Sequence, residues 1–194
     1  MRSWDALPYV PLKCAGPVTA AFMACGITDF QAAGRYLHAL PYGRTANRAD
    51  FSAVLHEGRG TCSTKHALLA TLAHEQQLSV VLTLGIYEMH EHNTPGVGVV
   101  LARYGLVSLP EAHCYLTYMG TCIDVTRSGA EPTAPITQFL HEEAIVPEQI
   151  GVYKVTLHRR CMQEWVRNNP ETVKGWRFED VWQIREECIA ALAQ

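Results

Sequence analysis

Hydrophobic residues recur with helical spacing through the first part of the chain. This pattern predicts helices over 17–25, 29–40 and about 62–77, the second of them capped by Asp29. A further short helix is expected to end at Gly58, because glycine is the usual residue just after a helix.

Farther along, the pattern becomes typical of strands. The nearly continuous apolar segment 79–87 predicts a strand that is covered on both faces. Two shorter runs, 112–118 and 120–125, predict a hairpin rich in β-formers. The segment 99–104 fits either a helix or a strand, and 127–135 is expected to be a turn-rich connection.

The C-terminal part returns to helical spacing, over 156–168 and 178–192. The chain has 194 residues, of which 48% are hydrophobic and 18% charged, which is enough for one well-buried core and short for two. We therefore expect a single domain, 1–194, composed of N-terminal helices (17–40), a core (about 42–126) and C-terminal helices (about 156–192).

Charge and hydropathy narrow the range of partners. The formal net charge is −3, and the 16 Lys and Arg residues are scattered, so the chain offers no basic field for nucleic acid. The start has no apolar leader, and no segment is as long as a membrane span. We therefore expect a cytoplasmic protein with no nucleic-acid or membrane partner, and the oligomeric state stays open.

One of the seven cysteines has the surroundings of a reactive thiol. Cys62 follows the glycine-rich approach Gly58-Arg59-Gly60-Thr61 and begins an apolar helix. The unpaired N–H groups at a helix N-terminus favour a thiolate and can hold an oxyanion. Cys62 is therefore the candidate nucleophile for acyl transfer, and such a thiol needs a histidine base.

The predicted hairpin offers that base and a carboxylate to orient it. His113 lies in its first strand and Asp124 in its second. A four-residue loop over 117–120 would place Leu116 opposite Thr121 and His113 opposite Asp124, on the same face of the sheet. Imidazole and carboxylate would then meet across the pair, and a loop longer or shorter by one residue would separate them.

Three motifs in this order resemble the transglutaminase-like superfamily of papain-type cysteine enzymes, in a small member of bacterial type. They are Gly60-Thr61-Cys62-x-x-Lys65-x-x-Leu68-Leu69, then His113-x-Tyr115, then Asp124-x-Thr126. The resemblance covers about 42–126. It implies an α+β fold in which the cysteine-bearing helix packs on an antiparallel sheet, and a metal-independent triad that needs no cofactor.

The resemblance also implies roles for these residues. Cys62 would be the nucleophile, His113 the general base and acid, and Asp124 the residue that orients His113. The reaction would be acyl transfer through a thioester, with hydrolysis of an amide or peptide bond in a small molecule, peptide or protein as the expected outcome.

The oxyanion of such a reaction needs two donors. The backbone N–H of Cys62 is the first, and the second is open. Candidates for oxyanion or substrate contacts lie beside the motifs or in the loop upstream of them: Tyr42, Arg44, Asn47, Thr61 and Tyr115. The upstream loop has an equally simple explanation as an exposed loop with a helix cap.

Departures from the family pattern leave the acyl acceptor open. Many members carry tryptophan two residues after the histidine and again before the aspartate, where this chain has Tyr115 and residues such as Cys122. An amine acceptor, as in a transamidase or acyltransferase, is therefore one alternative. Another is a scaffold or partner-binding protein that keeps the fold without the chemistry.

Two further features have a structural and a functional interpretation. Lys65 either packs its stem and exposes its ammonium or steadies the Cys62 thiolate. The pair His90 and His92 lies in a polar loop with no partner at a diagnostic metal-ligand spacing, so we expect a solvated turn and no metal site there.

Overall fold

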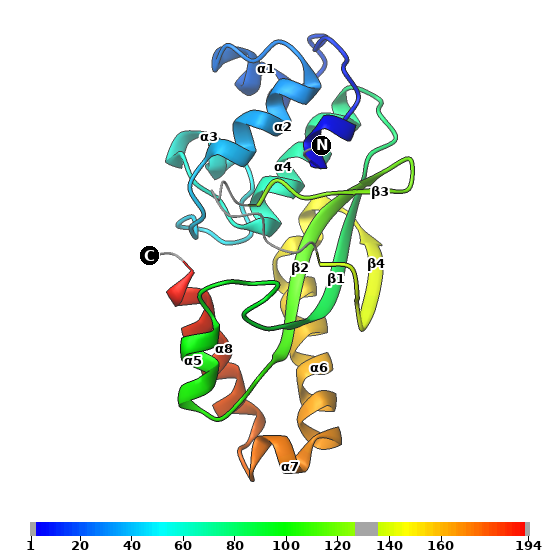
Figure 1. Cartoon of the computed structure of the whole chain (residues 1–194). Helices are drawn as coiled ribbons and strands as arrows, with labels where there is room; N and C mark the ends of the chain where they lie inside the picture. Colours follow the sequence, from blue (N-terminus) through cyan, green and yellow to red (C-terminus); the bar gives the residue numbers. More distant parts are fainter. Residues whose placement is uncertain (1–2, 127–135, 193–194) are drawn as a thin grey trace. The chain divides into compact units, whose positions relative to one another are not determined.

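The computed structural model describes residues 3–126 and 136–192 (Figure 1). The turn-rich connection expected over 127–135 lies outside these ranges. The elements are η1 (Ser3–Ala6), α1 (Pro17–Ala24), α2 (Phe30–Ala39), α3 (Ala53–Glu57), α4 (Cys62–Glu75), β1 (Val81–Met89), α5 (Gly98–Arg103), β2 (Leu109–Tyr118), β3 (Thr121–Ile123), β4 (His141–Ile145), η2 (Pro147–Ile150), α6 (Val152–Asn168), α7 (Pro170–Val173) and α8 (Phe178–Ala191).

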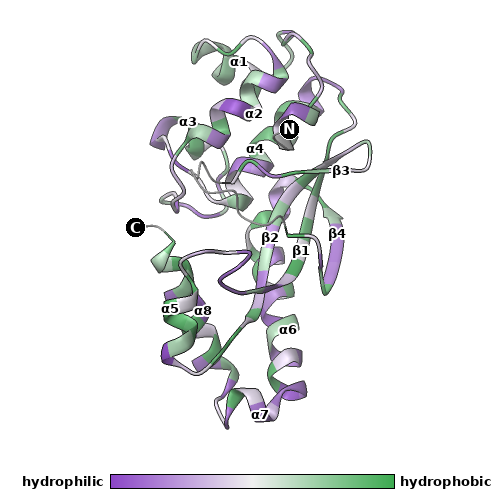
Figure 2. Ribbon diagram, viewed as in Figure 1, coloured by the Kyte–Doolittle hydropathy of each residue, from purple (hydrophilic) through white to green (hydrophobic). Residues whose placement is uncertain are grey.

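Helices and one antiparallel sheet make this an α+β protein, as expected. The four strands have the order β3-β2-β1-β4. The edge strand β4 is absent from the sequence prediction. It begins with His141, Glu142 and Glu143, and Figure 2 shows much of β4 in the hydrophilic colour. Its pattern therefore lacks the apolar alternation that identifies a half-buried strand.

The described residues fall into two compact units. Unit 1 comprises residues 3–84, 114–126 and 143–152, and unit 2 comprises residues 85–113, 136–142 and 153–192. Among the described residues, the chain passes from one unit to the other within β1, β2 and β4 and after the first residue of α6. The expectation of a single domain stays a prediction.

Unit 1 is built around α4, which packs against α1, α2, α3 and η2 (Figure 1). Two local signals read from the sequence are confirmed. Asp29 caps α2 by accepting the N–H of Ala32 at 2.7 Å, and Gly58 ends α3 with a left-handed φ of 65°. The large side chains at the centre of the unit are almost fully buried: Phe22, Phe30, Leu37, Leu68, Leu69 and Leu72.

The C-terminal end of α4 is anchored by its own last residue. The Glu75 carboxylate accepts the N–H groups of Val18 and Thr19, at 3.0 and 2.6 Å, in the first turn of α1. A negative charge at a helix N-terminus satisfies unpaired donors and interacts favourably with the helix dipole. This contact ties the last residue of α4 to the first turn of α1.

The hairpin formed by β2 and β3 turns more tightly than the sequence predicts. Tyr118 pairs with Thr121, so only Met119 and Gly120 form the loop. Both have positive φ, 48° and 76°, as a two-residue turn of type I′ requires. The predicted four-residue loop is wrong because methionine at the first of these positions is not a typical signal for such a turn.

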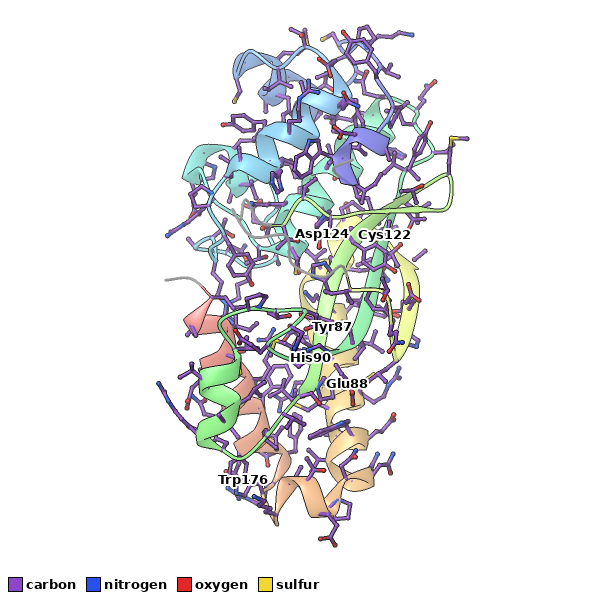
Figure 3. All side chains as sticks on the ribbon, in the orientation of Figure 1. Tyr87, Glu88, His90, Cys122, Asp124 and Trp176 are labelled. Carbon is purple, nitrogen blue, oxygen red and sulfur yellow. The ribbon has the colours of Figure 1, made fainter. Side chains whose placement is uncertain are left out.

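The tight turn shifts the strand register by two residues. Leu116 pairs with Ile123 and not, as predicted, with Thr121. β3 ends at Ile123, so Asp124 directly follows the last paired residue, where Figure 3 labels it. The prediction that Asp124 lies opposite His113 in the strand ladder is therefore wrong.

Unit 2 has its own hydrophobic core. The segment whose structure was open in the sequence is a helix, α5, and it packs against α8. The core draws on β1, α5, β2 and the C-terminal helices, through residues that include Met89, Leu101, Leu109, Met162, Val181 and Cys188. The predicted C-terminal helices are confirmed as α6 and α8, with the short α7 between them.

Within residues 3–126 and 136–192, none of the helices combines the length and the apolar character needed to cross a membrane.

Candidate functional site

Cys62 is the first residue of α4, as predicted, and the segment that precedes it is fixed by backbone contacts. Tyr42 and Gly60 form an isolated parallel bridge. The N–H of Gly43 donates to the Gly60 carbonyl, and the N–H of Gly60 donates to the Pro41 carbonyl, both at 3.2 Å. The chain just after α2 therefore holds the approach to the candidate nucleophile.

A capping box completes the N-terminus of α4. It joins Thr61 and Thr64, and the N–H of Thr61 donates to the Thr64 hydroxyl at 2.9 Å. Capping of this kind stabilises the first helical turn by about 1 kcal/mol. Cys62 lies in this turn and is 9% exposed, with its sulfur 3.8 Å from the Ser63 hydroxyl.

Lys65 is fully buried one turn into the helix. Its ammonium donates to the carbonyl of Leu40 at 2.6 Å and to that of Thr126 at 2.9 Å. The interpretation in which Lys65 exposes its ammonium is therefore wrong. The two acceptors lie 25 and 61 residues away in sequence, so helical spacing alone does not reveal them.

Burial lowers the pKa of Lys65 to about 8, because removing water disfavours the charged form. The charges of Asp124 and Cys62 act in the opposite direction and raise the pKa. A buried lysine with a strongly lowered pKa, on which a thiol and a carboxylate act electrostatically, is typical of functional sites.

His66 connects α4 to the segment that follows β3. Its Nδ1 lies 2.7 Å from the Cys62 carbonyl, and its Nε2 accepts the N–H of Val125 at 2.9 Å. Since a carbonyl can only accept, these bonds correspond to the neutral imidazole with the proton on Nδ1. The sequence interpretation missed this role, for which the four-residue spacing from Cys62 is the available signal.

Asp124 is held beside this imidazole. Its Oδ1 accepts the N–H of Thr126 at 2.8 Å and lies 3.6 Å from His66 Nε2. The side chain is 39% exposed. Unit 1 therefore places Cys62, Lys65, His66 and Asp124 in one cluster at the first turn of α4.

His113 belongs to unit 2. It is buried, and its ring lies edge-on to that of Tyr87, with centroids 6.1 Å apart. The assignment of His113 as the base for Cys62 stays a prediction.

The other site candidates have different surroundings. Tyr42 bridges to Gly60, and Thr61 caps α4. Asn47 is exposed, and its side-chain oxygen accepts the N–H of Ala49 at 3.0 Å, as in the alternative interpretation of a capped surface loop. Arg44 is partly buried in the same loop, and Tyr115 is buried on β2. The second oxyanion donor stays open among these residues.

In the described ranges, no three His, Cys, Asp or Glu side chains gather in a way that could hold a metal ion. The rings of His90 and His92 lie 5.9 Å apart, and the N–H of His90 donates to the Asn93 side chain at 3.0 Å. This local turn gives the histidine pair a structural explanation.

Comparison of the chain with protein-family models, with curated proteins and with solved structures gives no match. The family resemblance therefore depends on the three sequence motifs.

Proposed function

We propose that this protein is a cysteine-dependent enzyme that transfers acyl groups through a thioester on Cys62, in the manner of transglutaminase-like enzymes. The observation that carries the proposal is the cluster at the first turn of α4. It combines a thiol at a helix N-terminus with the buried ammonium of Lys65, on which the charges of both Cys62 and the Asp124 carboxylate act.

The proposed reaction has two steps. The Cys62 thiolate attacks the carbonyl carbon of an amide, and a tetrahedral oxyanion forms, stabilised by the N–H of Cys62 and one further donor. The C–N bond then breaks, the leaving amine takes a proton from the imidazolium of His113, and the acyl group stays on sulfur. Water, losing its proton to His113, attacks the thioester and releases the acid and the thiol.

The residues around Cys62 have distinct parts in this proposal. His66 fixes the Cys62 carbonyl and the Asp124 segment to each other, so it acts as a positioning residue. Both of its ring nitrogens are engaged, which favours the assignment of proton transfer to His113 that the resemblance implies. Asp124 is proposed to orient the base, and an amine in place of water would give transamidation.

A non-catalytic scaffold or partner-binding protein is the second candidate function. The hydrogen bonds of the cluster favour this alternative, because Lys65 and His66 bond to backbone groups of unit 1. Such bonds also serve a purely structural cluster. The two functions differ in whether a covalent acyl intermediate forms on Cys62.

The test uses p-nitrophenyl acetate as the acyl donor and the full chain as the enzyme. We expect a burst of nitrophenol and acetylation of the peptide that carries Cys62, detected by mass spectrometry. Cys62→Ala should lower turnover by roughly 10³-fold or more, while Cys14→Ala, which removes an exposed thiol, should leave it unchanged.

His113→Ala tests the assigned base in the same assay. Loss of proton transfer should lower turnover by about 10²- to 10⁴-fold. Adding hydroxylamine then distinguishes the acceptors, since a transferase would form the hydroxamate faster than it releases acetate. If the wild type turns over no faster than Cys62→Ala and no acetyl group is found on Cys62, the result would instead support the scaffold.

A further inference from the structure

The position of Lys65 relative to Cys62 follows from helix geometry. The two residues are three apart in the first turn of α4, a spacing that places side chains next to each other on one face. Both are buried. Long side chains in a helix also point toward its N-terminus, which directs the Lys65 stem back toward the turn that carries the thiol.

The stem of Lys65 is held in this direction by Gly60. A Cβ atom at Gly60 would lie only 2.9 Å from Cγ of Lys65 and 3.0 Å from the Thr64 hydroxyl. Glycine therefore lets the backbone that precedes Cys62 lie directly on the lysine stem. The ammonium is preorganised before any substrate binds.

Two donors of the ammonium go to backbone carbonyls, those of Leu40 and Thr126. Carbonyl oxygens satisfy the hydrogen bonds but carry no net charge, and an ammonium has three donors. Burying a cation is costly unless a negative charge compensates it. The ionisable groups whose charges act on Lys65 are Asp124, which is partly exposed, and Cys62.

We infer that Lys65 is a positioning residue, a fixed buried cation that holds Cys62 as a thiolate in the resting enzyme. The thiol proton leaves to solvent or to the base, and the ammonium keeps its own proton throughout the reaction. This inference deepens the proposed function and rests on it, because a stabilised thiolate is the form that attacks the acyl donor.

The charges that face Lys65 come from two elements. Cys62 lies on α4, and Asp124 follows β3. The ring of His66, the residue after Lys65 on α4, lies 3.6 Å from Asp124. The hydrogen bonds of His66 correspond to its neutral form, so the thiolate and Asp124 are the anions that share the cation. The pH profile of thiol reactivity should therefore respond to the charge at position 65.

Alkylation by iodoacetamide measures this response without any substrate. The rate at Cys62 is followed by peptide mapping against pH, with the exposed Cys14 as the reference thiol in the same chain. We expect Cys62 of the wild type to react faster than Cys14 at about pH 6. Lys65→Gln should lower the Cys62 rate there by about tenfold and move the profile up by about one pH unit.

Lys65→Gln removes the charge but keeps N–H donors for the two carbonyls, whereas Lys65→Met removes the donors as well. Comparing the two variants therefore separates the effect of hydrogen bonding from the effect of charge. Lys154→Met is the matched control, since Lys154 is a second buried lysine, in unit 2. It should leave the Cys62 profile unchanged. A folded Lys65→Gln variant with the wild-type profile would overturn the inference.

Failure of the inference and failure of the proposed function give different results. A Cys62 that reacts rapidly at about pH 6 in the wild type but slowly in Lys65→Gln supports the inference, even where p-nitrophenyl acetate leaves no acyl group on it. An acetylated Cys62 whose reactivity does not depend on Lys65 supports the function and contradicts the inference.

Discussion

Each unit contains a buried ionisable side chain, Glu111 in unit 2 and Lys65 in unit 1, and the two differ in the groups to which they bond. In unit 2, Glu111 is 5% exposed, and both of its oxygens accept bonds from the Arg185 guanidinium at 2.6 Å. In unit 1, Lys65 is fully buried and bonds to neutral carbonyls. The Glu111 carboxylate therefore bonds to an oppositely charged group, whereas the Lys65 ammonium bonds to uncharged groups.

The pKa values express this difference. Burial by itself would raise the pKa of Glu111, but the charges of Arg185 and His158 oppose it, and the pKa falls from 4.5 to about 2. Burial lowers the pKa of Lys65 from 10.5 to about 8. The environment of Glu111 favours its charged form, whereas that of Lys65 disfavours it. The Glu111 pair therefore stabilises the fold, and the Lys65 cluster is the better candidate for a functional site.

The largest effect on the free energy of unfolding is expected at the ion pair between Glu111 and Arg185. Glu111→Gln leaves the Arg185 guanidinium buried without its carboxylate, which should lower the free energy of unfolding by about 3–5 kcal/mol. Urea denaturation measures this loss. Glu186→Gln is the control, because Glu186 accepts a different N–H of Arg185, at 2.7 Å, and is partly exposed. Its effect should stay below about 1 kcal/mol.

The same variants sharpen the comparison when thiol reactivity is measured. If the two charges serve different purposes, Glu111→Gln should leave the pH profile of Cys62 alkylation unchanged under conditions where the protein stays folded. A double variant, Glu111→Gln with Arg185→Met, should recover part of the lost stability, because the Arg185 cation is then no longer buried without the Glu111 carboxylate. An equal loss in Glu186→Gln would contradict the assignment of a structural pair.

The next largest effect is on the pH dependence of stability. Between about pH 8 and 10.5, the unfolded chain still binds the Lys65 proton that the folded chain has lost. The free energy of unfolding should therefore rise with pH in this window, by about 3 kcal/mol in wild type relative to Lys65→Gln. Below pH 8 both states are protonated, and the difference between the two proteins should be constant.

Glu111 provides the comparison in acid. Its folded pKa of about 2 lies below the ordinary value of 4.5, so its stabilising contribution is complete above pH 4.5 and is lost as the pH falls toward 2. Wild type and Glu111→Gln should approach each other in stability over that range. Parallel curves for wild type and Lys65→Gln between pH 8 and 10.5 would show that Lys65 is not penalised by burial.

The sequence predicts the structural features that depend on residues close to one another along the chain. The Asp29 cap, the Gly58 stop and the start of α4 at Cys62 are all within a few residues of their partners. Caps and stops are local hydrogen-bond problems, so the residue types identify them. The resemblance also assigned Cys62 and Asp124 to one site, and their joint role there stays a prediction.

The rest depends on partners far away in sequence. Lys65 reaches Leu40 and Thr126, and His66 reaches Val125, none of which is marked by a side-chain pattern, because the bonding atoms are backbone atoms. The hairpin register depended on a left-handed Met119, a conformation that residue type does not favour. Tertiary packing thus decided both the environment of Lys65 and the position of Asp124.

The smallest effect, and the most specific, is expected from Gly60→Ala. The added methyl group would meet Lys65 Cγ at 2.9 Å and Val54 Cγ2 at 3.1 Å, so either the stem or the backbone before Cys62 must move. Such overpacking should cost about 1–3 kcal/mol and lower the alkylation rate of Cys62 at about pH 6.

Gly58→Ala is the matched control, two residues earlier in the same segment. Its φ of 65° strains any side chain, but nothing lies within 4 Å of the added Cβ. This variant should lose about 1 kcal/mol and keep the wild-type alkylation profile. If both variants lose stability but only Gly60→Ala changes the profile, the stem position controls the thiol. Equal alkylation profiles of Cys62 in the two variants would mean that the position of the Lys65 stem does not control the thiol. Lys65 and Glu111 would then differ in the direction of their pKa shifts but not in how strictly their positions matter.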